Sequence, residues 1–435
     1  MTRMKESGID WIGQIPEEWE VVRLQDIGDY KKGPFGSAIT IDMFIEKSPG
    51  SYKVYEQKNA IRGNCEIGEA YIPKSVYNNL KNFSVYPLDI IVSCAGTIGK
   101  CYILPEDCEQ GIINQALMRV RVNKSVNLEY FLYIFDIVLS YAAIKYSNGS
   151  AIKNIPPFNV LNKLRVTLPS NIEQHQIVNY LDKKTAQLDK AKALLEEQIQ
   201  KLKDYRASLI YETVTKGLDK TVPMKDSGID WIGQVPGGWG VKPLKYLASY
   251  DDETLTQSEI NSNQKINYVD IGAVEFTKGI NSYQEISMSE APSRARKIAK
   301  KGDTIISTVR TYLKAIAYVN DDYIVSTGFC VVRPKKVNSK YLNYAIMSDS
   351  FTGPVSKYAW GVSYPAISSS QLVNIPIPFP ESIEEQLSIV DYLDHKMLQI
   401  NQLIDIKQEQ IDNINKQRQT LIYDYVTGKR RGKEI

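Results

Sequence analysis

The chain has 435 residues, 43% of them hydrophobic, and a formal net charge of +3 at neutral pH. This length can bury the cores of two or three ordinary domains. The excess positive charge falls in segments 25–170 and 245–380, which favours an anionic partner there only weakly. No apolar run of about 18 residues and no apolar signal-peptide core near the first residue are present, which excludes a membrane-spanning helix and predicts a cytoplasmic protein.

Two nearly identical segments open the two halves of the chain. Residues 4–13 read MKESGIDWIG and residues 224–233 read MKDSGIDWIG. Trp11 and Trp19 return as Trp231 and Trp239 within the frame G-I-D-W-I-G-Q-[IV]-P-x-x-W. A repeat of this length implies two copies of a whole domain rather than a solenoid. We assign residues 1–24 to a conserved opening segment and residues 218–244 to a linker with the repeated opening segment.

The interiors of the two halves, residues 25–170 and 245–380, share little sequence and read as mixed β and α. The first predicts strands at 89–93, 101–104, 116–122 and 164–168 and a helix at 128–139. The second predicts strands at 268–271, 303–307, 315–319 and 329–333 and a helix at 341–347. Each interior closes on a proline-flanked strand, at Pro169 and at 376–380, which marks an edge strand or an exit from the domain.

A long helix is expected after each of these prolines, at 171–217 and 381–428. Apolar residues recur there every seven positions, at Leu181, Leu188, Leu195, Leu202 and Leu209 and at Leu393, Ile400, Ile414 and Leu421. The companion seam is apolar in the second helix (Val390, Met397, Ile404, Ile411) and weaker in the first (Val178, Thr185, Lys192, Ile199, Arg206). Gly217 and Gly428 stand where helix stops are expected. We predict antiparallel pairing of the helices, each about 60 to 68 Å long, as a spacer; the alternative is that each lies on its own domain. Residues 429–435 are expected to form a solvated basic tail, with phosphate contact as the alternative.

Catalytic constellations are missing from the sequence. The two histidines, His175 and His395, lie in the predicted long helices, and no phosphate-binding glycine loop is present. The N-P-P-F motif of amino-methyltransferases is interrupted by Ile155. Five cysteines without a C-x-x-C pair favour reduced, buried thiols over a metal site. We therefore expect no catalysis, no cofactor and no metal in this chain.

Polar loops between strands are the candidate DNA contacts. Small, hydroxyl, basic and aromatic residues together suit phosphate contacts through backbone N–H groups and base-edge contacts through side chains. Such loops occur at equivalent places in both halves, where residues 307–312 match the turn at 93–100. The candidates are Lys31, Lys32, Ser37, Lys53, Ser93, Thr97, Lys100 and Lys153 in the first half and Ser307, Arg310, Tyr312, Lys314, Trp360 and Ser363 in the second.

Taken together, these motifs resemble the specificity subunits of type I restriction-modification systems. The resemblance rests on the repeated S-G-I-D-W-I-G frame, the loops G-P-F-G-S and A-G-T-I-G-K, the loops S-T-V-R-T-Y and S-T-G-F, and the proline-strand-long-helix closure. It implies an α+β fold with two mixed α/β target-recognition domains, residues 25–170 and 245–380, separated by two long antiparallel coiled-coil helices in a pseudo-twofold internal repeat.

The same resemblance implies a role in recognition alone. Each domain would read one half of a bipartite double-stranded DNA site, which is asymmetric because the two readers differ. S-adenosylmethionine, ATP and Mg²⁺ would belong to two modification and two restriction subunits. A protein-binding coiled-coil scaffold and a free-standing DNA methyltransferase or nuclease remain as alternatives.

Overall fold

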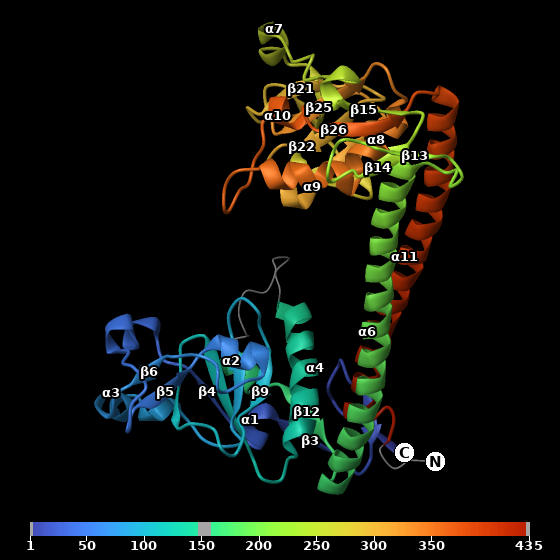
Figure 1. Cartoon of the computed structure of the whole chain (residues 1–435). Helices are drawn as coiled ribbons and strands as arrows, with labels where there is room; N and C mark the ends of the chain where they lie inside the picture. The colour runs from blue at the N-terminus through green and yellow to red at the C-terminus, as the bar shows by residue number, and fades with distance from the viewer. Residues whose placement is uncertain (1–2, 147–157, 432–435) are drawn as a thin grey trace. The chain divides into compact units, whose positions relative to one another are not determined.

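The computed structural model describes residues 3–146 and 158–431, which form two compact units. Unit 1 comprises residues 1–193 and 411–435, and unit 2 comprises residues 194–410. The two long helices, α6 (Asn171–Lys216) and α11 (Ile383–Val426), each contribute one part to each unit (Figure 1). No helix in the described part of the chain is both long and apolar enough to cross a membrane.

Unit 1 is built around two four-stranded sheets. The first has the order β4-β11-β8-β9 and the second the order β6-β5-β10-β7, in which β5 and β10 are parallel. A hairpin β1-β2 and the pair β3-β12 complete the strands. The strand bounds are β1 (Met4–Glu6), β2 (Gln14–Pro16), β3 (Glu20–Arg23), β4 (Gly28–Lys32), β5 (Tyr52–Tyr55), β6 (Tyr71–Ile72), β7 (Ser84–Val85), β8 (Ile90–Ser93), β9 (Cys101–Ile103), β10 (Gly111–Ile113), β11 (Leu117–Val122) and β12 (Arg165–Leu168). Its shorter helices are α1 (Leu24–Ile27), α2 (Gln57–Arg62), α3 (Lys74–Asn79), α4 (Leu128–Tyr146) and α5 (Phe158–Leu161).

Unit 2 repeats this topology. Its first sheet has the order β16-β25-β22-β23, and its second has the order β20-β17-β24-β21 with β17 and β24 parallel. The strand bounds are β13 (Met224–Asp226), β14 (Gln234–Pro236), β15 (Trp239–Pro243), β16 (Ala248–Tyr250), β17 (Lys265–Val269), β18 (Val274–Glu275), β19 (Gly279–Ile280), β20 (Gln284–Ser287), β21 (Ala295–Ala299), β22 (Thr304–Ser307), β23 (Ile316–Tyr318), β24 (Tyr323–Ser326), β25 (Phe329–Pro334) and β26 (Pro376–Pro380). Its shorter helices are α7 (Gln257–Ile260), α8 (Ser339–Met347), α9 (Asp349–Tyr358) and α10 (Ser369–Leu372). The duplicated fold therefore extends through the interiors, where the sequences have diverged.

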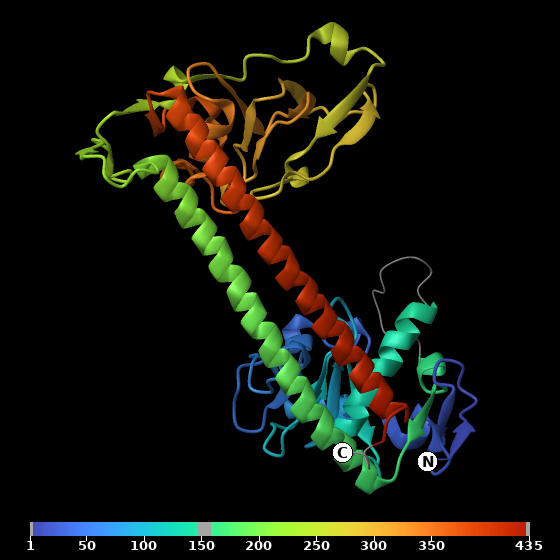
Figure 2. The same cartoon turned by 90° about the vertical axis from the view of Figure 1, so that its right-hand side faces the viewer.

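The helix pair is antiparallel within each unit (Figure 2). In unit 1, Tyr180 and Tyr425 lie with ring centroids 4.7 Å apart. In unit 2, Lys407 Nζ donates to Gln198 Oε1 at 2.6 Å. All nine predicted seam residues are buried or half-buried, and so is the companion seam, in which Thr185, Ile199, Arg206, Val390 and Ile411 are buried. The predicted fold class is thus confirmed. The companion seam of α6, although it contains Thr185, Lys192 and Arg206, is at least as deeply buried as the leucine seam of the same helix.

Tryptophans of the opening segments anchor the start of each long helix. Trp19 Nε1 donates to Glu173 at 3.1 Å, and Trp239 Nε1 donates to Glu385 at 2.9 Å. Gly217 and Gly428, which follow α6 and α11, have φ of +69° and +76°. A Cβ on Gly428 would lie 3.1 Å from Trp19, and one on Gly217 would lie 3.2 Å from Trp239. Glycine is therefore required both for the helix stop and for close packing on the tryptophan.

The prediction of a solvated tail from residue 429 is wrong for Arg431. This side chain is buried, and its guanidinium contacts Glu18 and lies 3.2 Å from Glu173. The two carboxylates raise the pKa of Arg431 through hydrogen bonds. Arg431 supplies the counter-charge for the buried carboxylate of Glu173, which favours packing of this last segment onto the rest of unit 1.

Candidate nucleic-acid interface

The turn between β22 and β23 of unit 2 is held from below by buried hydroxyl groups. Ser307 Oγ donates to the Val309 carbonyl at 2.6 Å, and Thr308 Oγ1 donates to the Gly328 carbonyl at 2.9 Å. Both side chains are buried, so Ser307 shapes the turn and does not lie on its outer surface as predicted. Beyond these bonds, Arg310, Tyr312 and Leu313 are exposed, whereas Thr311 is buried.

Two residues of this turn have an unusual backbone conformation. Arg310 and Lys314 flank a 3₁₀ turn (Thr311–Leu313) with φ of +50° and +46°. Positive φ is uncommon for residues other than glycine and persists only where surrounding contacts over-determine it. Here Lys314 Nζ is held by Asp349 Oδ1 at 2.8 Å, while the Arg310 side chain is exposed. The backbone thus presents Arg310 on the surface in one defined orientation.

A second loop, residues 359–367, is joined to this turn by backbone pairing. Val309 and Trp360 each bridge to Ala366, and Ile367 N donates to the Thr308 carbonyl at 2.9 Å. The guanidinium of Arg310 lies 4.8 Å from the centroid of the Tyr364 ring. Two segments about fifty residues apart in sequence therefore form one surface, which we call the unit 2 recognition surface and define as residues 310–314 and 360–364.

The unit 2 recognition surface combines a cation with exposed aromatic rings. Trp360 is 81% exposed and Tyr364 65% exposed, and Tyr312, Leu313 and Val362 are exposed as well. The Arg310 guanidinium, pre-oriented on a ring, offers the planar fork that pairs with guanine edges or phosphate oxygens. Of the predicted contacts, Arg310, Tyr312, Trp360 and Ser363 lie here in exposed positions, with half-buried Lys314 beside them. Leu313, Val362 and Tyr364 were missed; they lie in or beside the loops the sequence singled out, and only their exposure reveals them.

Unit 1 presents a different set of side chains. A hollow of about 500 Å³ is lined by residues 30–36, Phe83 and Gln115. Lys31 Nζ lies 5.5 Å from the centroid of the Phe83 ring, and Phe35 beside it is 88% exposed. Lys32 and Ser37 are exposed here as predicted.

The turn between β8 and β9 is the counterpart of the turn between β22 and β23. Ser93 Oγ accepts from Lys100 N at 2.9 Å and is fully buried, so its predicted surface role is wrong for the same reason as that of Ser307. Thr97 and Lys100 are exposed on this turn. A side-chain amide from α2, that of Gln57, donates to the carbonyls of Ala95 and Thr97 and supports the turn from beneath.

Lys53 does not lie on the surface. It is 1% exposed, its Nζ donates to the Glu66 carbonyl at 2.9 Å, and Glu109 lies 3.6 Å away. A lysine this deeply paired is part of the core polar network and has no free ammonium for DNA. The predicted contact Lys153 lies outside the described residues.

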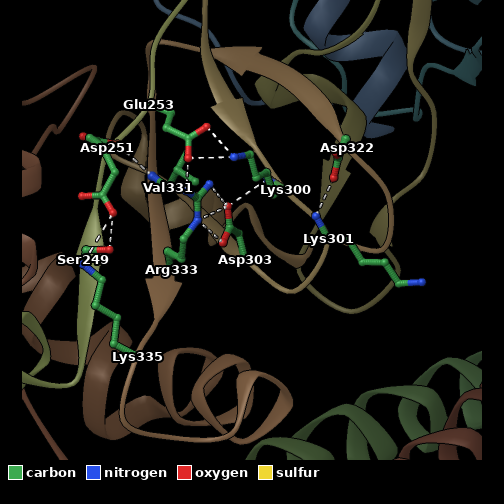
Figure 3. A network of polar contacts seen from close by, with 11 residues as sticks. Ser249, Asp251, Glu253, Lys300, Lys301, Asp303, Asp322, Val331, Arg333 and Lys335 are labelled. Atoms are coloured by element: carbon green, nitrogen blue, oxygen red, sulfur yellow. Dashed lines mark hydrogen bonds and ion pairs between the residues drawn. The ribbon is translucent and has the colours of Figure 1, made fainter.

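An ion-pair network lies beside the first sheet of unit 2, next to the start of β22 (Figure 3). Arg333 of β25 contacts Asp303 at 2.9 Å and also Glu253, which in turn binds Lys300 at 2.7 Å. The bond to Asp303 raises the pKa of Arg333, and the bonds from Lys300 and Arg333 lower the pKa of Glu253. Unit 1 has the matching pair Arg121 and Asp89 at 2.7 Å. The network ties β25 to Asp303, the residue that precedes β22.

Groups suited to metal binding or nucleophilic chemistry do not gather in the described residues. No three His, Cys, Asp or Glu side chains converge on a possible ion site there. All five cysteines are free thiols, and burial raises the pKa of Cys94 and of Cys330 to about 12. Such thiols are protonated at neutral pH and are poor nucleophiles.

Comparison with known proteins gives one consistent family. The family model described as the type I restriction modification DNA specificity domain matches residues 16–203 and 236–416. The MjaVIII specificity subunit of Methanocaldococcus jannaschii is 24% identical over 437 residues, covering 97% of this chain and 95% of that protein. The EcoBI specificity subunit of Escherichia coli is 24% identical over 433 residues, covering 94% and 84%. A solved structure from work on complex assembly and conformational transition of the type I R-M system has a TM-score of 0.67 at 17% identity, covering 94% of this chain and 98% of that one.

Proposed function

The chain belongs to the family of type I restriction-modification DNA specificity proteins, and on this premise we propose that it selects the DNA sequence on which such a complex acts. Each unit reads one half of a bipartite double-stranded target. The turn between β8 and β9 of unit 1 and the turn between β22 and β23 of unit 2 are equivalent in the repeated fold but carry different side chains, so the two half-sites differ. The target is therefore asymmetric.

The observation that carries this proposal is the unit 2 recognition surface. Two joined loops carry its exposed aromatic rings and the Arg310 guanidinium, which lies over the ring of Tyr364. Exposed apolar side chains gathered in one patch mark an interaction site. The added arginine favours a partner with anionic and hydrogen-bonding edges, which DNA provides. A scaffold that binds protein alone would not require an arginine among exposed aromatic rings at this turn of unit 2.

The outer surface of the helix pair serves as the mount for partner subunits. Leu194, Leu403 and Ile406 are exposed on the parts of α6 and α11 that belong to unit 2. Apolar side chains on a paired helix surface suit a further protein contact. We assign them to the docking of two modification subunits, which supply S-adenosylmethionine chemistry, alongside two restriction subunits, which supply ATP- and Mg²⁺-dependent steps. The chain itself contributes recognition without catalysis.

Mapping of methylated adenines tests the proposal. In cells that carry the complete system, we expect methylation at one asymmetric bipartite sequence, lost when this chain is deleted. Grafting foreign residues into 310–314 and 360–364 should change one half-site and leave the other intact. Methylation that persists without the chain, or a palindromic target, would contradict the proposal.

A further inference from the structure

A cleft of about 650 Å³ lies within unit 2 and shares Lys314 with the unit 2 recognition surface, although no residue of the loop 359–367 lines it. It opens between residues 203–210 of α6, residues 394–401 of α11, the hairpin β18-β19 and helix α8. Apolar side chains such as Phe276, Ile316 and Met397 form much of its wall. The cleft is large enough for an organic molecule of the size of a modified amino acid.

The charge of the cleft wall is unbalanced. Five cationic side chains and two carboxylates line it. Both carboxylates are already engaged, because Asp394 binds Lys340 at 2.6 Å and Asp349 binds Lys314 at 2.8 Å. The hydroxyl of Tyr344 also donates to Asp394 at 2.6 Å. The wall therefore carries positive charge that no carboxylate of the lining neutralises.

Arg206 is a buried cation of this wall that has no carboxylate partner in the described part of the chain. It is only 8% exposed, and its one hydrogen-bond partner in the described part of the chain is Asn401, whose Oδ1 lies 2.9 Å from Nη1. Burial lowers the pKa of Arg206, whereas carboxylate partners raise the pKa of Arg333 and Arg431. A buried guanidinium with most of its donors unused is costly unless an anion joins it.

The internal repeat shows which group completes this environment. The equivalent of Arg206 in unit 1 is Arg418, and the equivalent of Asn401 is Asp189. Arg418 Nε lies 3.5 Å from Asp189 Oδ1, so in unit 1 a carboxylate occupies the position at which unit 2 has a neutral amide. These positions correspond in the repeat, because a neighbouring contact occurs in both units. Tyr133 donates to Asp182 at 2.6 Å in unit 1, and Tyr344 donates to Asp394 at 2.6 Å in unit 2. Both units thus have an arginine at this position, but Arg206 is more deeply buried than Arg418 and has an amide in place of the carboxylate as its neighbour.

A second polar group of the cleft is also incomplete. Asn343 of α8 is 8% exposed, and its Oδ1 is buried without a hydrogen-bond partner. Its Nδ2 is directed to Met347 Sδ at 3.3 Å, a weak acceptor. The cleft lining thus includes an acceptor from α8 without a donor and a cation from α6 without a carboxylate partner in the described residues.

We propose that this cleft is a binding site for a small organic carboxylate. Its carboxylate pairs with the Arg206 fork, in the role that Asp189 has for Arg418. Its apolar body lies against Ile316 and Met397, and a donor on that body completes Asn343 Oδ1. Charge-assisted bonds to a buried guanidinium supply affinity, and the apolar wall selects against inorganic anions.

Calorimetric titration of the purified full chain with 4-hydroxyphenylacetate tests this site. This probe carries a carboxylate, an apolar ring and a hydroxyl donor. We expect saturable binding, and binding about tenfold or more weaker for the neutral amide of the same acid, because the amide cannot form the charged pair. Absence of saturable binding, or equal affinity for acid and amide, overturns the proposal.

Two matched variants locate the site. Asn401→Asp supplies an internal carboxylate to Arg206 and should reduce binding of the acid at least tenfold while stabilising the fold. Asp189→Asn makes the same exchange in reverse in unit 1 and should leave binding unchanged. Equal affinity of Asn401→Asp and the wild type overturns the assignment. DNA binding by each variant is measured separately, so that failure of this site and failure of the proposed DNA recognition are distinguishable.

Discussion

Three arginines of unit 2 show how the surroundings set the role of one side-chain type. Arg333 is saturated by Asp303 and Glu253 and holds two strands together. Arg310 is exposed on a ring face and is available to a partner. Arg206 is buried beside an amide and lacks an anion. One type of side chain can therefore hold the structure together, contact a partner or bind a ligand, depending on which groups lie within hydrogen-bond distance of its guanidinium.

The substitution Arg310→Ala should weaken binding of the DNA target by about 1 to 3 kcal/mol if the guanidinium reads a base. Duplex titrations with the reconstituted complex at one fixed salt concentration measure this. Arg310→Lys serves as the control, because it keeps the charge but loses the planar fork, and should recover only the part of binding that is independent of sequence. Unchanged affinity of Arg310→Ala for the target would refute the assignment.

Among structural elements, the long helices were the easiest to predict. Their seven-residue repeat and their glycine stops specify α6 and α11 locally, because helix periodicity is written into neighbouring residues. The seam with Thr185 and Arg206 looked weak in sequence yet is buried, at Thr185 within unit 1 and at Arg206 within unit 2. The strands that were predicted lie close to β8, β9, β11, β12, β17, β22, β23, β25 and β26. Others, such as β5, β10, β20 and β24, were not predicted, and neither was the order of the strands within the sheets.

The helix pair as a spacer gives a prediction at the same scale. Inserting one heptad into α6 between residues 193 and 194, with a matching heptad in α11 between 410 and 411, keeps both seams in phase. Each helix grows by about 10.5 Å, so the nonspecific gap of the target should lengthen by about three base pairs.

Methylation mapping reads the gap directly. Both half-sites should stay as they are, because neither recognition surface changes. A four-residue insertion in one helix is the control. It shifts the seven-residue repeat of that helix relative to its partner, so the seams no longer face each other and methylation should be abolished. An unchanged gap in the heptad variant would show that the helices do not set the spacing.

At the scale of the whole molecule, the duplication explains features that look local. The same sheet orders, the same tryptophan-to-glutamate bond and the same tyrosine-to-aspartate bond occur in both units. In unit 1 the two ends of the chain also meet, through Arg431 with Glu18 and Glu173. Unit 1 is thus closed by residues from the first and last parts of the sequence.

Removal of that closure should destabilise the protein. Arg431→Ala leaves Glu173, whose side chain is 3% exposed, without its counter-charge and should lower the free energy of unfolding by about 3 kcal/mol. Arg430→Ala removes the neighbouring arginine, whose exposed pair with Asp424 contributes about 0 to 1 kcal/mol. Denaturant unfolding of the two variants side by side should separate them, and identical midpoints would contradict the role of Arg431.

The sequence by itself determined the duplication, the heptad helices, some of the strand positions and the loops that carry the recognition residues, because each is encoded by spacing or by neighbours in the chain. Tertiary structure alone decided which polar side chains are exposed: it buried Lys53, Ser93 and Ser307, exposed Tyr364 and paired Arg431. It also decided that Arg206 pairs with the amide of Asn401, whereas Arg418 at the equivalent position of unit 1 pairs with the carboxylate of Asp189. Burial and pairing depend on residues distant in the chain, and no local pattern records them.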